Sequence, residues 1–361
     1  MAAKYQQVEH ELIHRIRTDQ YSINDKLPTE TNLIKEFNVS RQTIRRAISE
    51  LERKHYVYKI QGSGTYVTDW HQNWNQKKSN KIIGVITTHV TNYIFPEIIS
   101  GIDTTITDKG YSLILGNTHN NHQRERNAIL NMLDLKVAGL IIEPTQSALP
   151  NPNIDLYMKI KELNIPIVFI NSSYSNIEAP VLRMDDRLAE YELTNLLFEH
   201  GHQRIIGIFK VDDNQGYERM NGFIQAFQVN EIELSKSHVI MYQSSDHFSQ
   251  ICDNLNIYMK RTDPPTAICC YNDQLAIKII SYLQKHEVDV PADISVIGFD
   301  DYSMSRYINP RITTAIHVKR QMGIDAANQI LSMLSGNTGK SITYHAHLIT
   351  GQSIKRIKYN N

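Results

Sequence analysis

Four side chains that can hydrogen-bond to DNA bases lie close together near the start of the chain: Arg41, Gln42, Arg45 and Arg46. A guanidinium group can bond O6 and N7 of guanine at once, and a glutamine carboxamide can bond adenine in the same bidentate way. In a helix these four positions lie at its start and on its open side, because Ile44 begins an apolar stripe on the other side. Their types and spacing favour contact with base edges in the major groove.

The surrounding segment is predicted to form two short helices joined by a tight turn. Ser40 is a good N-cap for the helix that carries the arginines, and Thr29 is a good N-cap for the helix before it. Both helices have an apolar face, as does an earlier helix over residues 5–16. The apolar positions are Val8, Leu12, Ile13, Ile16, Leu33, Ile34, Phe37, Ile44, Ala47, Ile48 and Leu51. Two short helices in this order are typical of a helix-turn-helix.

After these helices the sequence alternates between apolar and polar residues over 56–60 and 65–68, with glycines between the two stretches. This pattern predicts a β-hairpin with a glycine turn. A hairpin directly after a recognition helix is a wing. Gly62 and Gly64 allow its tip to approach a phosphate backbone closely, because glycine has no Cβ.

Charge is unevenly distributed along the chain. Residues 1–80 contain 13 Lys and Arg against 9 Asp and Glu, whereas the remaining residues contain 25 against 29. The formal net charge of zero therefore combines a basic N-terminal part with an acidic remainder. A basic N-terminal part favours a polyanionic partner.

The N-terminal part resembles the GntR family of bacterial regulators in three segments, residues 27–30, 39–47 and 62–67, and the resemblance covers about 70 residues. It implies a winged helix-turn-helix whose third helix contacts bases or phosphates and whose Gly64 enters the minor groove. Double-stranded operator DNA is the implied partner. The expected DNA-contacting residues are Lys4, Thr29, Glu30, Ser40, Arg41, Gln42, Thr43, Arg45, Arg46, Gln61, Gly62 and Gly64.

A chain of 361 residues exceeds one ordinary core, so two or three domains are expected. We expect a DNA-binding domain over residues 1–69, a polar linker over 70–80 and an effector-binding domain over 81–361. The linker contains Trp70 and Trp74, which could pack the N-terminal domain onto the rest of the chain or onto a partner subunit.

From residue 81 onward, apolar runs of strand length alternate with helical stretches. The runs cover residues 82–86, 112–116, 138–142, 166–170, 204–209, 267–271 and 294–299. Near-continuous apolar strands belong to parallel sheets with helices on both faces. The sequence therefore predicts a doubly wound α/β domain of two lobes. Lobe 1 is expected at about 81–184 and 317–342, and lobe 2 at about 185–316 and 343–361.

Carboxylate, carboxamide and hydroxyl side chains follow several of these runs. Ligands of such sheets bind outside the carboxyl ends of the strands, so these residues are site candidates. They suit a ligand with many hydroxyl groups, because each hydroxyl can both donate and accept. The Gly-rich GxGxxG phosphate loop is missing from the first strand. The strand-end candidates are Thr87, Thr88, Asn117, Glu143, Asn171, Asn272, Asp273, Asp300 and Asp301.

The large domain resembles the sugar-binding domain of the lactose and galactose repressor family, which is periplasmic-binding-protein-like. The resemblance is carried by residues 137–142, 201–205, 219–223, 271–276 and 294–301. It implies that the equivalents of Arg219, Asn272 and Asp300 hold the ligand's hydroxyls. Asn171 stands where many members have Asp, and His317 lies near the expected hinge. With Tyr93 and Phe95 as possible covers for a sugar ring, the ligand-binding set is expected to be Tyr93, His119, Glu143, Asn171, Arg219, Asn272, Asp300 and His317.

The two resemblances together match the domain combination of arabinose repressors of Gram-positive bacteria. They imply a transcriptional repressor that L-arabinose releases from its operator. Another pentose, a hexose or a nucleoside is the alternative effector. Because one helix-turn-helix supplies few base contacts, we expect a homodimer on an inverted repeat.

A sugar-acting enzyme with a DNA-binding domain is the alternative from another functional class. The chain has no GxSxG nucleophile elbow, and we expect neither catalysis nor a metal, and no cofactor. Its three cysteines lack the CxxC spacing of metal sites. With no apolar leader and no run of about 18 apolar residues, the protein is expected in the cytoplasm and not at a membrane.

Overall fold

The computed structural model describes residues 4–18, 20–54, 56–68, 81–91, 93–234 and 238–357. It divides the chain into two compact units, Met1–Ser79 and Asn80–Asn361, called the head and the body here. The predicted linker over residues 70–80, with Trp70 and Trp74, lies outside the described residues. None of the described helices is long and apolar enough to cross a membrane.

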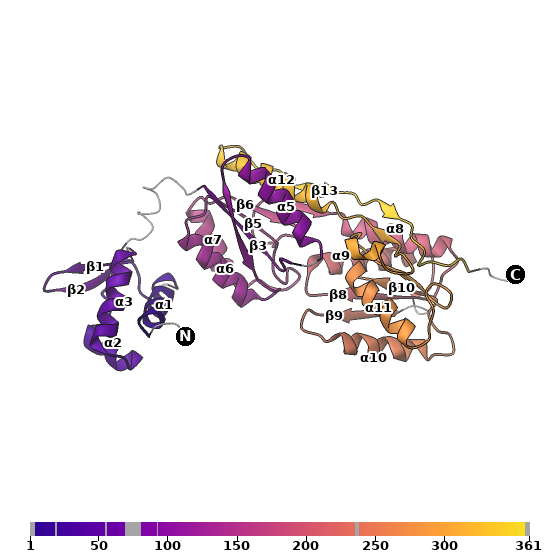
Figure 1. The fold of residues 1–361 in the computed structure, drawn as a ribbon, viewed down its shortest axis with the longest axis horizontal. Coiled ribbons are helices and arrows are strands. Elements are labelled where there is room, and N and C mark those ends of the chain that lie inside the picture. The colour runs from indigo at the N-terminus through magenta and orange to yellow at the C-terminus, as the bar shows by residue number, and fades with distance from the viewer. Residues whose placement is uncertain are drawn as a thin grey trace. The chain divides into compact units, whose positions relative to one another are not determined.

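The described residues of the head form three helices and an antiparallel hairpin (Figure 1). The Thr29 hydroxyl accepts a hydrogen bond from Asn32 N, and the Ser40 hydroxyl accepts one from Thr43 N, so both residues cap helices as predicted. The apolar faces form one core in which Leu12 and Ile44 are fully buried. The predicted winged helix-turn-helix is confirmed. Its elements are α1 (Lys4–Arg17), α2 (Glu30–Phe37), α3 (Arg41–Arg53), β1 (Val57–Ile60) and β2 (Gly64–Val67).

Lobe 1 of the body has a six-stranded parallel sheet in the order β13-β7-β6-β5-β3-β4. Ile83 and Val85 of β3 point into a core with α5 and α12. A Cβ at Gly84, between them, would lie 2.9 Å from Met132 Sδ of α6, so helices cover both faces. The elements are β3 (Ile82–Thr87), α5 (Phe95–Thr107), β4 (Ser112–Asn117), α6 (His122–Asp134), β5 (Gly139–Ile142), α7 (Ile154–Glu162), β6 (Ile167–Ile170), β7 (Val181–Met184), α12 (Lys319–Leu334) and β13 (Ile342–Tyr344).

Lobe 2 has a four-stranded parallel sheet in the order β11-β10-β8-β9 and a small antiparallel pair, β12 and β14. Phe209 of β8 packs in a core with α8 and α9, whereas Ile206 and Ile208 pack with α10 and α11 on the other face. The elements are α8 (Asp186–Glu199), β8 (Ile205–Lys210), α9 (Asn214–Val229), β9 (His238–Tyr242), α10 (Phe248–Met259), β10 (Ala267–Cys270), α11 (Asp273–Lys285), β11 (Ser295–Ile297), η2 (Ser303–Arg306), β12 (Thr314–Ala315) and β14 (Leu348–Ile349). The predicted doubly wound two-lobed domain is confirmed.

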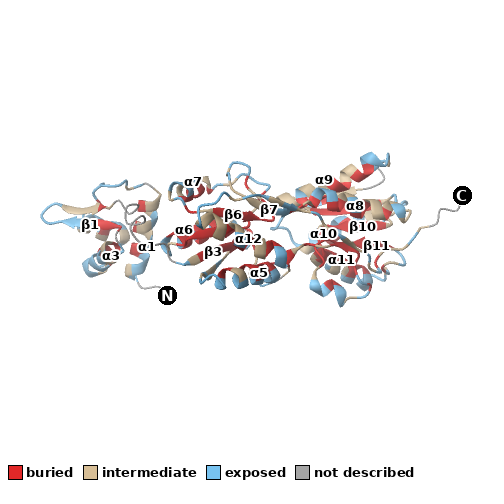
Figure 2. Cartoon of the chain, turned by 90° about the horizontal axis from the view of Figure 1, so that it is seen from above, coloured by how far each residue is buried: buried red, intermediate tan, exposed pale blue. Residues whose placement is uncertain are grey.

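The chain passes between the two sheets three times, after β7, between β12 and α12, and after β13. We call residues 184–186, 316–318 and 344–347 the crossing segments. Figure 2 shows the buried strands of each lobe enclosed by helices that are exposed on their outer sides. The carboxyl ends of β7, β12 and β13 lead directly into the crossing segments. These strand ends therefore lie where the lobes meet.

Helices α5 and α12 lie unusually close together, as Figure 1 shows along one side of lobe 1. A Cβ on Gly323 of α12 would lie 2.1 Å from the carbonyl oxygen of Ile98 in α5, and one on Gly101 would lie 2.4 Å from the carbonyl oxygen of Arg320. Neither glycine can be replaced without moving a backbone. This contact holds α12, which starts two residues after His317, firmly on lobe 1.

Candidate effector cleft and DNA-binding face

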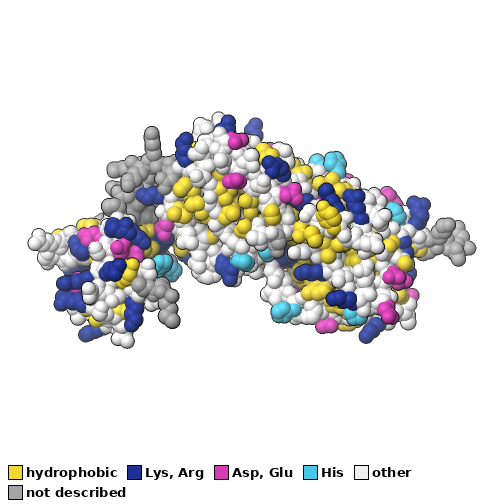
Figure 3. Space-filling model, viewed as in Figure 1, with side chains coloured by type: hydrophobic (Ala, Val, Ile, Leu, Met, Phe, Trp, Pro, Cys, Tyr) yellow, Lys and Arg dark blue, Asp and Glu magenta, His cyan; other side chains and the backbone are white. Residues whose placement is uncertain are grey.

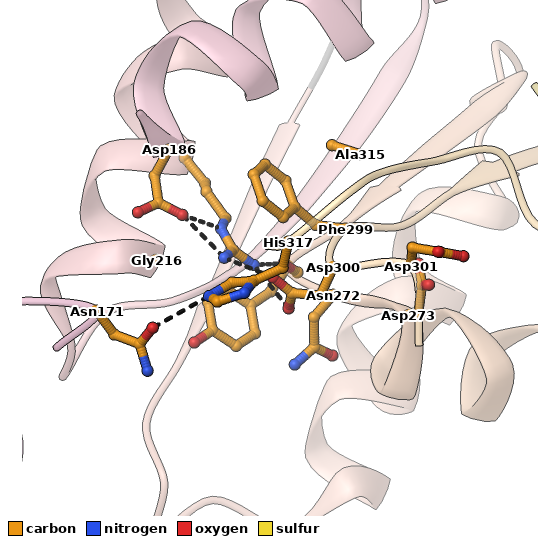
Figure 4. Close-up of polar contacts among 12 residues, drawn as sticks. Asn171, Asp186, Gly216, Asn272, Asp273, Phe299, Asp300, Asp301, Ala315 and His317 are labelled. Atoms are coloured by element: carbon orange, nitrogen blue, oxygen red, sulfur yellow. Dashed lines mark hydrogen bonds and ion pairs between the residues drawn. The ribbon is translucent and has the colours of Figure 1, made fainter. Parts of the chain in front are cut away.

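A cleft of about 300 Å³ opens between the lobes of the body, at the carboxyl ends of strands from both sheets. All eight residues expected to bind the ligand line it: Tyr93, His119, Glu143, Asn171, Arg219, Asn272, Asp300 and His317. Figure 4 shows Asn171, Asn272, Asp300 and His317 converging from different segments. A small pocket with a few convergent polar groups is the usual form of a ligand site.

Arg219, on the second turn of α9, is fixed by bonds to three residues. Its Nε donates to Asp186 Oδ1 at 2.9 Å, its Nη1 donates to the Tyr271 carbonyl at 2.6 Å, and its Nη2 lies 3.1 Å from Asp300 Oδ1. The guanidinium also lies 3.6 Å from the centre of the Phe299 ring. The bonds to Asp300 are the longest of the set. A ligand hydroxyl could bridge this pair, accepting from Arg219 and donating to Asp300.

A second chain of hydrogen bonds enters the cleft from lobe 1. Glu143, directly after β5, accepts bonds from Thr88 N at 2.9 Å and Thr88 Oγ1 at 2.7 Å with one carboxylate oxygen. Its other oxygen accepts from Asn171 Nδ2 at 2.9 Å. This fixes the carboxamide of Asn171, whose Oδ1 then faces His317 Nε2 at 3.0 Å. Since a carbonyl oxygen only accepts, His317 carries its proton on Nε2.

The other ring nitrogen of His317 has no hydrogen-bond partner in the part of the chain that the structure describes. Its Nδ1 is buried and accepts no hydrogen bond from any of the described residues. Burial lowers the pKa of His317 well below its usual value, and the charges of Lys319 and Arg219 lower it further, so the ring is neutral at pH 7. A buried acceptor without a donor costs free energy. A hydroxyl of a bound ligand would satisfy it.

The remaining predicted residues border the cleft in different ways. Asn272 caps α11, because its Oδ1 accepts from Leu275 N at 2.9 Å, and its Nδ2 stays available for a ligand. Tyr93 reaches from lobe 1 to lobe 2, where its hydroxyl donates to the Phe299 carbonyl at 3.4 Å and its ring packs on Tyr302. His119 is exposed at the mouth. Tyr93 thus offers an aromatic wall as well as a contact between the lobes.

Four strand-end candidates do not reach the cleft. The Thr87 hydroxyl donates to the His89 carbonyl at 2.6 Å. Asn117 accepts a bond from His119 N, Asp273 accepts one from Tyr302 N, and Asp301 pairs with Arg306. Asp273 and Asp301 each follow a residue that does line the cleft, Asn272 and Asp300. Neighbouring residues at a strand end point in different directions, which the sequence pattern indicated but could not resolve for each pair.

Sequence reasoning did not select Lys210, Asp213 or Asp186, which also line the cleft. Lys210 ends β8, and its Nζ lies 2.8 Å from Asp213 Oδ2. Burial acts against the charged form of Lys210, but Asp213 and Asp212 outweigh it and raise its pKa. The strand-end rule, applied to β8 as it was to other strands, would have selected Lys210 and Asp213. Asp186 follows β7, a strand that the apolar runs did not reveal.

In the head, Arg41 and Arg45 of α3 are exposed and hydrogen-bonded to Glu30 of α2. Glu30 accepts hydrogen bonds from Arg41 Nε at 3.2 Å and from Arg45 Nε at 3.0 Å. Burial raises the pKa of Glu30, but the two arginines outweigh it and leave the pKa below its ordinary value. Glu30 thus holds both guanidinium groups beside one another on the open side of the helix. Figure 3 shows Lys and Arg side chains gathered on one visible face of the head.

The other predicted DNA-contacting residues divide into exposed donors and residues that shape the surface. Gln42 and Arg46 are exposed on α3, and the Arg46 guanidinium lies 4.1 Å from the centre of the Tyr5 ring. The hydroxyls of Thr29, Ser40 and Thr43 take part in the helix caps. Lys4 begins α1, Gln61 and Gly62 lie in the exposed hairpin turn, and the half-buried Gly64 begins β2, with positive φ at both glycines.

Comparisons with known proteins agree with both parts of this structure. Residues 4–67 match a profile described as bacterial regulatory proteins, gntR family, and residues 194–354 match a periplasmic binding protein-like domain. The chain is 37% identical over 359 residues to the arabinose metabolism transcriptional repressor of Geobacillus stearothermophilus, covering 98% of both. The chain belongs to this family of transcriptional repressors. The predicted combination of a GntR head with a lactose-repressor-type body is confirmed.

Two further proteins are similar to the repressor, one over nearly its whole length and one over its body. The arabinose metabolism transcriptional repressor of Halalkalibacterium halodurans is 37% identical over 368 residues, covering 99% of this chain and 98% of the relative. The crystal structure of a LacI family transcriptional regulator from Enterococcus faecium with bound ribose has a TM-score of 0.66 at 22% identity. It covers 77% of the repressor and 100% of that chain, so it shares the fold of the body.

Proposed function

We propose that L-arabinose is the effector of this repressor, that it binds in the cleft between the lobes, and that it releases the head from operator DNA. The observation that carries the proposal is the unpartnered Nδ1 of His317 beside the Arg219–Asp300 pair. An acceptor that needs a donor and a pair that a hydroxyl can bridge both favour a small polyol. The two relatives that match the whole chain are named for arabinose metabolism.

The charges of the cleft favour a neutral ligand. Arg219 is paired with Asp186 and Asp300, and Lys210 is paired with Asp213. Each cation among these residues thus has its carboxylate already in place. A phosphate would have to compete with these carboxylates, whereas a sugar hydroxyl can join a bond without displacing a charge.

On the DNA side, we propose that Arg41, Gln42, Arg45 and Arg46 of α3 contact the major groove and that the wing contacts the backbone. Glu30, Thr29, Ser40 and Thr43 would shape this surface, and Lys4 and Gln61 would add contacts at its edge. We further propose that the repressor acts as a homodimer in the cytoplasm on an inverted repeat, because two heads double the number of base contacts.

The effector is tested with a thermal-shift panel of sugars, because a ligand that binds only the folded state raises Tm with its occupancy. We expect L-arabinose to raise Tm more than D-ribose, D-xylose, D-galactose and adenosine at equal concentration. A gel-shift titration of operator DNA should then show weaker binding with L-arabinose. A larger rise in Tm with another pentose, a hexose or a nucleoside would identify that compound as the effector and would leave the proposed mechanism unchanged. Sugar that leaves operator affinity unchanged would reject the mechanism.

We also propose that the body binds its sugar without turning it over. The test is a day-long incubation of purified repressor with L-arabinose, followed by chromatography of the sugar. An unaltered sugar is expected, and any product that the Arg219→Ala variant does not form would favour a sugar-acting enzyme instead.

A further inference from the structure

We propose that Asp186 is a positioning residue of the effector site: it holds the Arg219 guanidinium in place for the ligand and ties it to the first crossing segment. This inference rests on the proposed function, because it concerns the same cleft. The Asp186–Arg219 contact has two short parts, 2.9 Å from Nε and 2.8 Å from Nη2 to the same carboxylate oxygen. Figure 4 shows Asp186 and Asp300 on opposite sides of the guanidinium group that both contact.

The two carboxylates around Arg219 differ in their positions. Asp300 contacts the guanidinium at 3.1 and 3.4 Å and lines the cleft, where a hydroxyl can bridge Arg219 and Asp300. Asp186 makes the shorter contacts and lines both this cleft and a second cavity, of about 860 Å³. Without Asp186, Arg219 would keep the bonds of its terminal nitrogens to Asp300 and to the Tyr271 carbonyl, but its Nε would lose its partner and the side chain could turn toward Asp300. Asp186 prevents this turn and keeps the donors of Arg219 directed into the cleft.

Asp186 is well placed to link the ligand with the movement of the lobes. It is the first residue of α8 and is separated from β7 of lobe 1 by a single residue, so its backbone belongs to the crossing segment 184–186. Its side chain reaches Arg219 of lobe 2. A ligand that shifts Arg219 therefore also shifts the crossing segment 184–186. The strand before this segment is fixed in the lobe 1 sheet, where Leu182 pairs with Ile170 and Ile342.

Asp185 provides a matched control next to it in the chain. Its carboxylate accepts a hydrogen bond from Leu188 N and caps α8. Asp185 lines the second cavity and not the cleft. Asparagine caps a helix as well as aspartate does. Asp185→Asn therefore removes one carboxylate from the same crossing segment and leaves the hydrogen-bond partners of Arg219 in place.

The first test is a double-mutant cycle on L-arabinose affinity, measured by calorimetry for Asp186→Asn, Arg219→Gln and the double variant. We expect Asp186→Asn to weaken binding at least tenfold in the wild-type background and less than threefold in the Arg219→Gln background. Asp186→Glu should recover part of the loss, and Asp185→Asn should bind within twofold of wild type. Operator affinity without sugar should stay within twofold throughout, which verifies folding. Equal losses in both backgrounds, or an equal loss in Asp185→Asn, would overturn the inference.

The second test needs no sugar and so separates this inference from the identity of the effector. In the ¹H–¹⁵N spectrum of the ligand-free repressor, the Arg219 Nε–H signal is assigned by its loss in Arg219→Gln. We expect a slowly exchanging signal in wild type and Asp185→Asn, and a shifted, rapidly exchanging one in Asp186→Asn. An unchanged signal in Asp186→Asn would overturn the inference even if L-arabinose binds. A wild-type repressor that does not bind L-arabinose but shows the expected spectra would reject only the proposed effector.

Discussion

His317 and Asn171 join a crossing segment to lobe 1, with His317 Nε2 3.0 Å from Asn171 Oδ1. The bond fixes the tautomer of the histidine and directs the unprotonated Nδ1 away from Asn171. We expect His317→Ala to weaken sugar binding about tenfold or more, because the ligand loses an acceptor and Asn171 Oδ1 loses its donor. Calorimetry measures the loss. His345→Ala is the control, since this crossing-segment histidine is 71% exposed, and a loss of similar size there would contradict the role of His317.

Arg219→Ala and Asp300→Ala should each give a repressor that still binds its operator but is not released by sugar. Each change leaves a buried partner unpaired in the cleft, which costs roughly 1–3 kcal/mol or more for charged groups. Sugar affinity is measured by calorimetry and operator affinity by gel shift, on variants shown to be folded by circular dichroism. Wild-type sugar affinity in either variant would remove that residue from the site.

The coupling between the two ligands should be reciprocal. If sugar weakens operator binding by some factor, operator DNA must weaken sugar binding by the same factor, and such couplings usually amount to about 1–3 kcal/mol. Calorimetry of the wild-type repressor with and without operator DNA measures the second factor, for comparison with the gel-shift value. Unequal factors at matched salt and temperature would show that a further equilibrium, such as dimerisation, takes part.

Arg45→Ala should weaken operator binding by about 1–3 kcal/mol per half-site, because a bidentate base contact is lost. It should not change sugar affinity. Arg53→Ala is the matched control, since Arg53 is an exposed arginine at the end of the same helix and pairs with Glu50. Gel shifts at fixed salt compare the two. A loss in Arg53→Ala as large as that in Arg45→Ala would indicate a general charge effect and not base contact.

Glu190→Gln should make the stability of the body less dependent on pH. Burial raises the pKa of Glu190 to about 7, although the Cys269 thiol and the Arg219 charge act in the opposite direction. The folded state therefore holds this proton more tightly than the unfolded chain. Its contribution to stability is fully present below the unfolded pKa of about 4.5 and is lost as pH rises through about 7.

The free energy of unfolding, measured with urea at pH 5 and pH 8, tests this. Between these pH values wild type should lose about 2–3 kcal/mol more than Glu190→Gln, from the size of the pKa shift. Only the change in the free energy of unfolding between the two pH values is compared, because the buried amide of the Glu190→Gln variant lowers stability by the same amount at both. Glu192→Gln, on the exposed side of the same helix, should follow wild type. Parallel curves for wild type and Glu190→Gln would contradict the raised pKa.

Gly323→Ala should destabilise the body by about 1–3 kcal/mol, the usual cost of overpacking a tight contact. The added Cβ would lie 2.1 Å from the Ile98 carbonyl oxygen, and both helices would have to separate. Asn328→Ala, on the exposed side of α12, is the control and should be neutral or slightly stabilising, since alanine favours helix. Tm values by calorimetry that are equal for the two variants would show that α5 and α12 adjust freely.

Several features of the repressor follow from local sequence. The caps at Thr29 and Ser40, the apolar stripe of α3 and the hairpin after it are local signals, and the head has the predicted elements. In the body, long apolar runs identified the central strands, and the polar residues after them supplied Glu143, Asn171, Asn272 and Asp300. The strand predictions succeeded because a strand buried on both faces must be apolar along its length. The residues after the strands line one cleft because the strand ends of a parallel sheet meet at one edge.

Only the tertiary structure decided which of the strand-end residues face the cleft and how they are paired. β7 and β13 are short and partly exposed, so they lack the apolar pattern, and Asp186 was missed with β7. The proton position on His317 depends on Asn171 and Glu143, which are 146 and 174 residues away in the chain. The direction of Arg219 depends on one carboxylate from α8 and another after β11. Hydrogen-bond partners from separate segments are set by the packing of the lobes, and no local pattern in the sequence records that packing.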